Sequence, residues 1–144
     1  MKILPCVIGL GYVGLPIYIK LKNSFETYGF DTSARRIKEL NNGFDNQFQF
    51  LKNDLFIKNK NLNFTSSLKS ISKCNFFIVC VPTPIYKNKK PDLRSLKQAC
   101  ENIAKILKRN DIIIFESTVY PGVTEEICIQ IILKNSKIKK KDFY

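Results

Sequence analysis

The chain has 144 residues, a formal net charge of +12, five cysteines and no histidine. Its length predicts a single domain over residues 1–144, large enough for a core of its own. No apolar run approaches the roughly 18 residues of a membrane span, and Met1 leads straight into a predicted strand, which leaves no room for a signal peptide. We therefore expect a cytoplasmic protein without a membrane partner.

The positive charge is spread along the chain, and this distribution does not predict a nucleic-acid partner. Two lysine-rich segments, 87–90 and 137–141, fall in predicted loops, where they could assist an anionic, nucleotide-like ligand. The absence of histidine and of Cys-x-x-Cys spacing excludes the common zinc patterns, so no metal site is predicted. Most cysteines fall on predicted strands or helices, and we expect them to be buried, inert thiols.

The first unit of the chain predicts a strand over 5–8, a glycine-rich turn and a helix over 12–21. The turn follows the pattern Gly-x-Gly-x-x-Gly, at Gly9, Gly11 and Gly14. Gly9 suits a tight turn, Gly11 lets the backbone approach a pyrophosphate, and Gly14 lets the helix pack close to the strand. Phosphates at that place would face free amides and the positive end of the helix dipole. The spacing alone is a weak signal, because glycines recur this closely by chance.

A second predicted strand, over 27–30, ends on Asp31. An acid at the end of this strand is where the adenosine ribose hydroxyls of NAD would be held. The carboxylate would also repel the 2′-phosphate of NADP, so Asp31 favours NAD as the cofactor.

Two alternatives remain open at this position. Asp31 could instead cap the helix predicted over 33–40, a role that Thr32 or Ser33 fills equally well. Arg35 and Arg36 lie close by in the sequence, and an arginine there can accommodate a 2′-phosphate.

Strands and helices alternate through the rest of the chain. They are a short strand near 63–65, a helical turn over 67–73, a strand over 76–81, a helix over 93–107 capped by Asp92, a strand over 112–115 and a helix over 121–133. Residues 142–144 resemble the opening of a further strand, whereas 41–61 is too irregular to assign. This order predicts an α/β fold with a doubly wound parallel sheet, and three segments should meet at the carboxyl ends of its strands: the glycine turn, 82–84 and 116–118.

Several motifs occur together in one order. They are Gly9-Leu10-Gly11-Tyr12-Val13-Gly14-Leu15-Pro16, Gly29-Phe30-Asp31, Val81-Pro82-Thr83-Pro84, Lys90-Pro91-Asp92-Leu93 and Glu116-Ser117-Thr118-Val119-Tyr120-Pro121-Gly122. Together they resemble the NAD-binding N-terminal domain of the UDP-glucose/GDP-mannose dehydrogenase family, a Rossmann-like domain. The Thr83-Pro84-Ile85 loop and the segment from Glu116 to Gly122 look most like the branch that oxidises UDP-N-acetyl-hexosamines.

The resemblance implies an oxidoreductase that oxidises the C6 hydroxyl of a UDP-sugar to a carboxylate with two NAD. In the family a cysteine captures the aldehyde, but none of the five cysteines matches that motif. The catalytic half, the substrate-binding domain and the central helix through which members dimerise would therefore lie outside this chain. We expect a fragment that binds NAD weakly and turns over no substrate, while a homo-oligomer stays possible.

The resemblance also assigns roles to residues of the predicted cofactor site. The amides near Tyr12 and Val13 would contact the pyrophosphate, and Arg36 would lie on the adenine side of the ribose that Asp31 holds. Thr83 would line the cofactor cleft. The remaining assignments are Pro82 and Pro84 as residues that fix the Thr83 loop, and Thr118 beside the nicotinamide ribose, as the one candidate catalytic residue, helping to hold a water. Ordinary turn chemistry at strand ends is the alternative for these positions.

Two other functions remain open at this stage. One is the cofactor domain of a β-hydroxyacid or 6-phosphogluconate-type dehydrogenase, which shares the N-terminal fold. The other is a stand-alone or regulatory dinucleotide-binding module. The family branch tends to carry an acid near Gln49, where this chain does not, so we assign no contacts to the segment around it.

Overall fold

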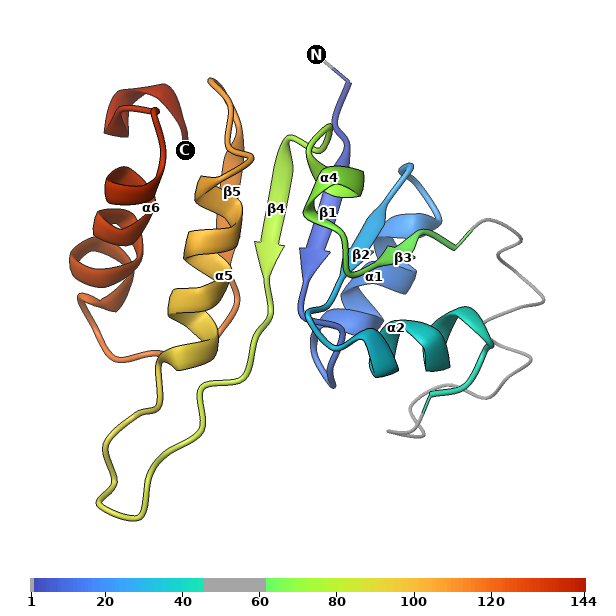
Figure 1. Ribbon diagram of the computed structural model, residues 1–144, viewed down its shortest axis with the longest axis horizontal. Helices are drawn as coiled ribbons and strands as arrows, with labels where there is room; N and C mark the ends of the chain where they lie inside the picture. The colour runs from blue at the N-terminus through green and yellow to red at the C-terminus, as the bar shows by residue number, and fades with distance from the viewer. Residues whose placement is uncertain (1, 46–61) are drawn as a thin grey trace.

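A computed structural model describes residues 2–45 and 62–144, and Gln49 lies outside this part. Five parallel strands form one sheet in the order β3-β2-β1-β4-β5. The strands are β1 (Pro5–Ile8), β2 (Tyr28–Phe30), β3 (Phe64–Thr65), β4 (Phe76–Val79) and β5 (Ile112–Phe115). The helices are α1 (Gly14–Lys22), α2 (Ala34–Asn41), α4 (Leu68–Ile71), α5 (Arg94–Ala104), η1 (Val123–Cys128), α6 (Ile129–Asn135) and η2 (Lys140–Asp142). This arrangement confirms the doubly wound α/β fold (Figure 1).

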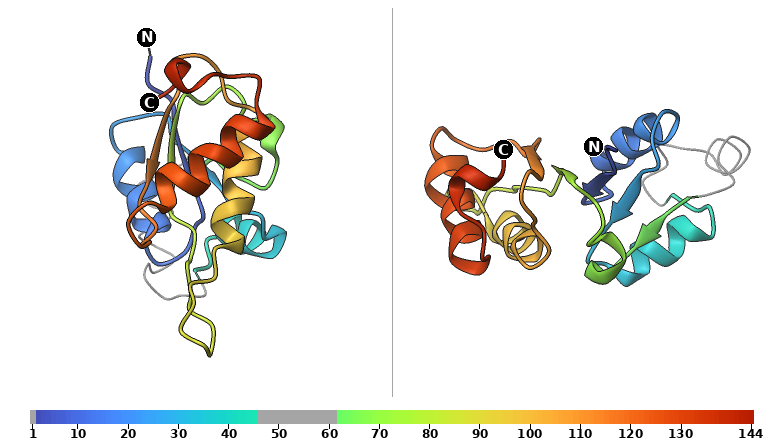
Figure 2. Two further views of the ribbon diagram at one scale, coloured as in Figure 1. Left: turned by 90° about the vertical axis from the view of Figure 1, so that its left-hand side faces the viewer. Right: turned by 90° about the horizontal axis from the view of Figure 1, so that it is seen from above.

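Alternate residues of the central strands point to opposite faces of the sheet, as the pleat requires. On one face Cys6 lies beside Phe77, and both belong to a core that α4, α5 and α6 cover. On the other face Val7 lies beside Ile78, in a core shared with α1 and α2. The sheet therefore lies between two layers of helices, and the view from above shows α1 on one side of it and α5 and α6 on the other (Figure 2).

The first residues of α2 and α5 show how these helices begin. Ser33 is the N-cap of α2, and its hydroxyl accepts a hydrogen bond from the Arg36 amide at 3.2 Å. The capping role that the sequence left open therefore belongs to Ser33, not to Asp31. In α5 the N-cap is Leu93, one residue later than predicted, while the preceding Asp92 accepts from the Arg94 amide at 3.0 Å.

The helix predicted from residue 121 begins later than expected. Gly122 adopts φ +93, in the left-handed region, so a right-handed helix cannot run through it from Pro121. The regular structure starts at Val123 with the π-helical turn η1 and continues as α6. A π-helical turn of this kind occurs often near functional sites.

At the C-terminal end, only part of the expected strand forms. Lys140–Asp142 is a 3₁₀ turn, but the Tyr144 amide donates to Asp111 O at 3.0 Å and Tyr144 O accepts from the Ile113 amide at 2.7 Å. This pair of bonds brackets Ile112, as in a parallel ladder. Tyr144 therefore pairs with the outer edge of β5.

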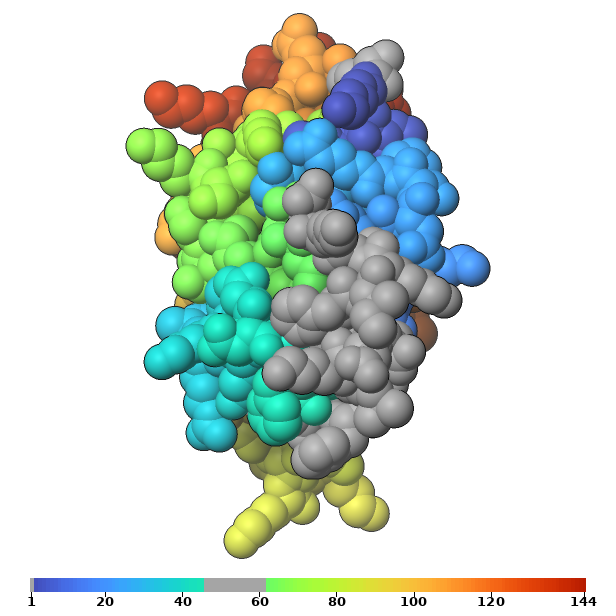
Figure 3. Space-filling view, turned by 90° about the vertical axis from the view of Figure 1, so that its right-hand side faces the viewer, coloured from blue at the N-terminus to red at the C-terminus, as the bar shows by residue number. Residues whose placement is uncertain are grey.

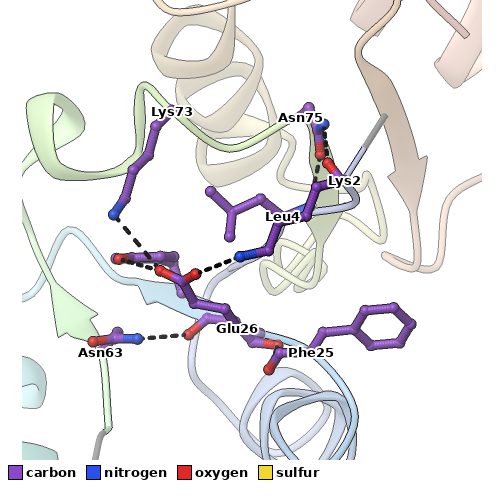
Figure 4. Close-up of polar contacts among 9 residues, drawn as sticks. Lys2, Leu4, Phe25, Glu26, Asn63, Lys73 and Asn75 are labelled. Carbon is purple, nitrogen blue, oxygen red and sulfur yellow. Dashed lines mark hydrogen bonds and ion pairs between the residues drawn. The ribbon is translucent and has the colours of Figure 1, made fainter.

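At the amino ends of the strands, polar side chains join neighbouring elements. Asn75, just before β4, donates to Lys2 O at 2.9 Å and accepts from the Leu4 amide at 2.8 Å. Glu26, just before β2, lies between Lys2 at 3.1 Å and Lys73 at 3.7 Å (Figure 4). The hydrogen bond from Lys2 lowers the pKa of Glu26 below its usual value. These contacts tie the start of the chain to β2 and β4.

The predicted burial of the cysteines is confirmed: all five are buried and none forms a disulfide. Within the described residues, no helix is long and apolar enough to cross a membrane, and no group of acidic, histidine or cysteine side chains is arranged to hold a metal ion.

Candidate functional site

The glycine turn joins β1 to α1 at the carboxyl edge of the sheet. Gly9 adopts φ +91, and a Cβ added to it would lie 3.0 Å from Cys80 O. A Cβ on Gly14 would overlap the carbonyl oxygen of Gly9, so only glycine lets α1 start this close to β1. Val13, the N-cap of α1, provides no side-chain acceptor to the first turn of the helix. The turn is therefore a backbone surface at a helix N-terminus, which suits an anion.

A first cavity of about 550 Å³ lies at the ends of β1, β2 and β4 and against the start of α5. Its lining combines apolar residues with polar side chains from two sources, the segment after β2 and helix α5. The lining residues used below are Asp31, Ser33, Arg36, Arg94, Gln98 and Ala99.

Asp31 is fixed in this cavity by backbone donors on both sides. Its Oδ2 accepts from the Leu10 amide at 2.9 Å, and its Oδ1 accepts from the Ser33 amide at 2.9 Å. A carboxylate can accept about four hydrogen bonds, so Asp31 keeps acceptor capacity for ligand hydroxyls. Its first bond reaches back to the residue after Gly9, which couples the position of the acid to that of the glycine turn.

Arg36 also lines the first cavity, but its guanidinium is bound to the protein itself. Its Nε donates to Leu10 O at 2.9 Å, and its Nη2 lies 2.8 Å from Asp45 Oδ1. Both side chains of this ion pair are almost completely buried. Sequence reasoning missed Asp45, because it belongs to the irregular 41–61 segment and no local pattern marks it. Arg35 is bound in turn to Glu39 at 2.9 Å.

A second cavity of about 280 Å³ lies between the loops that follow β4 and β5. Thr83 Oγ1 donates to Thr118 O at 2.6 Å, and the two threonine hydroxyls lie 3.5 Å apart. Ser117 Oγ donates to Val81 O at 2.7 Å and so joins the same two loops. Tyr12 and Val13 of the glycine turn complete the lining. The three segments that the sequence predicted to meet therefore do meet.

The two cavities share Gly11, Cys80, Val81 and Pro82 and so adjoin over the glycine turn. A dinucleotide has two nucleosides joined by a pyrophosphate, and this arrangement fits it: one cavity for each nucleoside and a backbone turn between them. Of the residues assigned to the predicted cofactor site, Gly14 and Pro84 are absent from both linings. Gly14 lies behind the turn, where α1 packs on β1.

Comparison with known proteins supports this fit. Residues 1–144 match the model of the NAD binding domain of the UDP-glucose/GDP-mannose dehydrogenase family. The chain belongs to this family. Its cofactor is NAD, and the β-hydroxyacid-type alternative is not supported.

Individual relatives agree with the family assignment. The chain is 45% identical over 139 residues to a UDP-N-acetyl-D-glucosamine 6-dehydrogenase of Salmonella typhi, covering 96% of this chain and 32% of that protein. It is 44% identical over 139 residues to Protein CapL of Staphylococcus aureus, again covering 96% of this chain and 32% of that protein. A ternary complex of GDP-mannose dehydrogenase from Pseudomonas aeruginosa superposes with a TM-score of 0.88 at 27% identity, covering 97% of this chain and 34% of that one. The chain thus spans about one third of the length of these relatives.

Cys80 is the one cysteine of this NAD-binding domain that lines both cavities. Burial raises the pKa of its thiol to about 11, with a smaller contribution from Glu116. The thiolate is the nucleophilic form, and at neutral pH Cys80 is therefore protonated and unreactive. Its position beside both cavities therefore does not make Cys80 a candidate nucleophile.

Sequence reasoning missed the wall that α5 contributes to the first cavity. Arg94, Ser95, Gln98 and Asn102 line it together with Ala99. The available signal was the polar face of the predicted 93–107 helix, because residues four apart share one side of a helix. A polar helix face usually means solvent exposure, and nothing in the sequence showed that this one borders a cavity.

Proposed function

We propose that this chain is the cofactor half of an enzyme that oxidises the C6 hydroxyl of a UDP-N-acetyl-hexosamine to a uronic acid with two NAD. The observation that carries the proposal is the pair of adjoining cavities on either side of the glycine turn. The substrate class follows from the names of relatives such as UDP-N-acetyl-D-glucosamine 6-dehydrogenase. The UDP-sugar is the proposed partner of the whole enzyme only, and we expect no nucleic-acid partner.

In this proposal, each cavity holds one nucleoside of the cofactor. Asp31 accepts hydrogen bonds from the adenosine ribose hydroxyls with the acceptor capacity that Leu10 and Ser33 leave. The amides of Gly11, Tyr12 and Val13 face the pyrophosphate, with Gly9 and Gly14 shaping the turn. NAD, when bound, supplies the hydride acceptor.

On the nicotinamide side, the 2.6 Å hydrogen bond from Thr83 to Thr118 O fixes the two loops around the second cavity. Pro82 restricts the backbone that leads into this contact. Thr118 Oγ1 then faces the nicotinamide ribose and helps to hold a water near the reacting carbon. Arg36 acts at the adenosine ribose chiefly by holding Leu10 O and thereby the backbone next to Asp31.

Cytoplasmic localisation is also part of the proposal. Five buried free thiols fit a reducing compartment, where disulfides rarely persist. A homo-oligomer is compatible with the structure, although nothing in the described residues specifies one.

Calorimetric titration of the purified chain with NAD and NADP tests the cofactor assignment. We expect NAD to bind weakly but more tightly than NADP, because the Asp31 carboxylate repels a 2′-phosphate. Asp31→Asn should weaken NAD binding about ten- to a hundredfold, as expected for loss of charge-assisted hydrogen bonds, and narrow the preference over NADP. Glu125→Gln, a carboxyl-to-amide change at an exposed position outside both cavity linings, is the matched control.

Two outcomes would contradict the proposal in different ways. Failure of the unsubstituted chain to bind NAD at millimolar concentration would remove the cofactor site. Formation of a uronic acid from a UDP-sugar by the chain alone would show that the catalytic groups lie within these 144 residues.

A further inference from the structure

Arg94 opens α5 and lines the first cavity, the same cavity that contains Asp31. None of the predicted cofactor roles involves α5, yet this helix supplies one whole wall. We propose that Arg94 binds the adenine base of NAD, with Asp92 as its positioning residue. The inference rests on the function proposed above, since it concerns the cofactor that the site would hold.

The guanidinium of Arg94 is fixed although most of its side chain is exposed. Its Nη2 donates to Asp92 Oδ2 at 2.6 Å, and its Nε lies 3.0 Å from each Asp92 oxygen. Asp92 is itself buried, and its amide donates to Pro84 O at 2.7 Å. The pKa of this carboxyl is held well below its usual value, chiefly by the hydrogen bond from Arg94. The pair therefore stays ionised at neutral pH.

A second contact restricts Arg94 from outside the cavity. Its Cζ lies 5.7 Å from the centre of the Tyr86 ring, and Tyr86 is not part of the cavity lining. Tyr86 belongs to a finger of residues 84–91 that an Ile85–Pro91 bridge closes and that projects from the carboxyl edge (Figures 1 and 3). An exposed ion pair of this type adds little to stability. Its effect is to hold a planar cation at the cavity mouth.

The position suits the base rather than the phosphates. Asp31 places the adenosine ribose in this cavity, and the glycine turn places the pyrophosphate toward the second one, so the base must lie on the remaining side. The apolar lining there includes Phe30 and Ala99, which suit the face of a purine. Planar guanidinium groups stack on aromatic rings in a way that a lysine ammonium does not. Gln98, one turn after Arg94, provides an amide for the polar edge of the base.

The test compares ligands that share only part of NAD. ADP-ribose contains adenine, and nicotinamide mononucleotide contains a phosphate but no adenine. We expect Arg94→Ala to weaken ADP-ribose binding about five- to tenfold and to leave nicotinamide mononucleotide binding unchanged. The affinity of Arg94→Lys for ADP-ribose should stay within about twofold of that of Arg94→Ala, because lysine restores the charge but not the planar group. The affinity of Asp92→Asn for ADP-ribose should lie between that of the unsubstituted chain and that of Arg94→Ala.

Arg109→Ala is the matched control, since Arg109 is another exposed arginine paired with a carboxylate, Asp142 at 3.3 Å, outside both linings. It should change neither affinity, and thermal unfolding checks that each variant is folded. Undiminished ADP-ribose binding by Arg94→Ala, an equal loss for both ligands, or full rescue by Arg94→Lys would each overturn the inference while leaving the proposed function intact. If the unsubstituted chain bound neither NAD nor ADP-ribose, the proposed function would fail and this inference with it.

Discussion

The two edges of the sheet differ in whether their polar side chains border a cavity. At the amino edge, charged groups are matched with one another: Glu26 lies between Lys2 and Lys73, and Lys108 contacts the buried Asp111. At the carboxyl edge, Arg36 and Arg94 also form ion pairs, but these arginines, like the backbone-bonded Asp31, line a cavity. The difference indicates that one edge is closed by its own side chains, whereas the other is ordered and still open to a ligand.

The largest expected effect comes from the turn that shapes the open edge. Gly14→Ala places a Cβ against the carbonyl oxygen of Gly9, and neither backbone can yield without moving β1 or α1. We expect a loss of about 3 kcal/mol in the free energy of unfolding, together with the loss of NAD binding. Urea unfolding and an NAD titration measure the two effects. A variant of native stability that still binds NAD would show that the turn does not need this close approach.

The smallest expected effect comes from the closed edge. Glu26→Gln removes an exposed partner of Lys2 and Lys73, so it should lower stability slightly at neutral pH and low salt and leave NAD binding unchanged. The pKa of Glu26 is lowered in the folded state, so its contribution is present above the unfolded value of 4.5 and is lost as pH falls through the lowered value.

The difference between Glu26→Gln and the unsubstituted chain should therefore disappear in acid. The urea midpoint measured from pH 7 downward at low salt follows this change. A change in NAD affinity would instead show that the two edges are not separate in function.

The sequence predicted the parts of the molecule whose signals are local. The glycine turn, the apolar strand β4 and the acid after β2 each depend on neighbouring residues, and all were found in place. Boundaries were less accurate where one residue overrides a pattern. Gly122, for example, delays the last long helix to Val123 because it adopts a left-handed conformation that the apolar spacing does not reveal.

The parts that could not be predicted depend on contacts between distant segments. Asp45 forms an ion pair with Arg36 but belongs to a stretch of sequence without periodicity, so no sequence pattern predicts that contact. The cavity wall formed by α5 has the same origin, since it exists only because the parallel sheet brings the start of α5 beside the end of β2. For Thr83 and Thr118, the sequence predicted only that the ends of their two strands meet. It did not predict the hydrogen bond between them.

Backbone amide shifts during an NAD titration of the purified chain test the central claim most directly. We predict shifts in the glycine turn, around Asp31, and at Thr83 and Thr118, with none at Glu26 or Asn75. AMP, which lacks the nicotinamide-side ribose, should reproduce the shifts near Asp31, and nicotinamide mononucleotide those near Thr83 and Thr118. Shifts centred on the amino edge, or the same set of shifts from both fragments, would contradict the assignment of one nucleoside to each cavity.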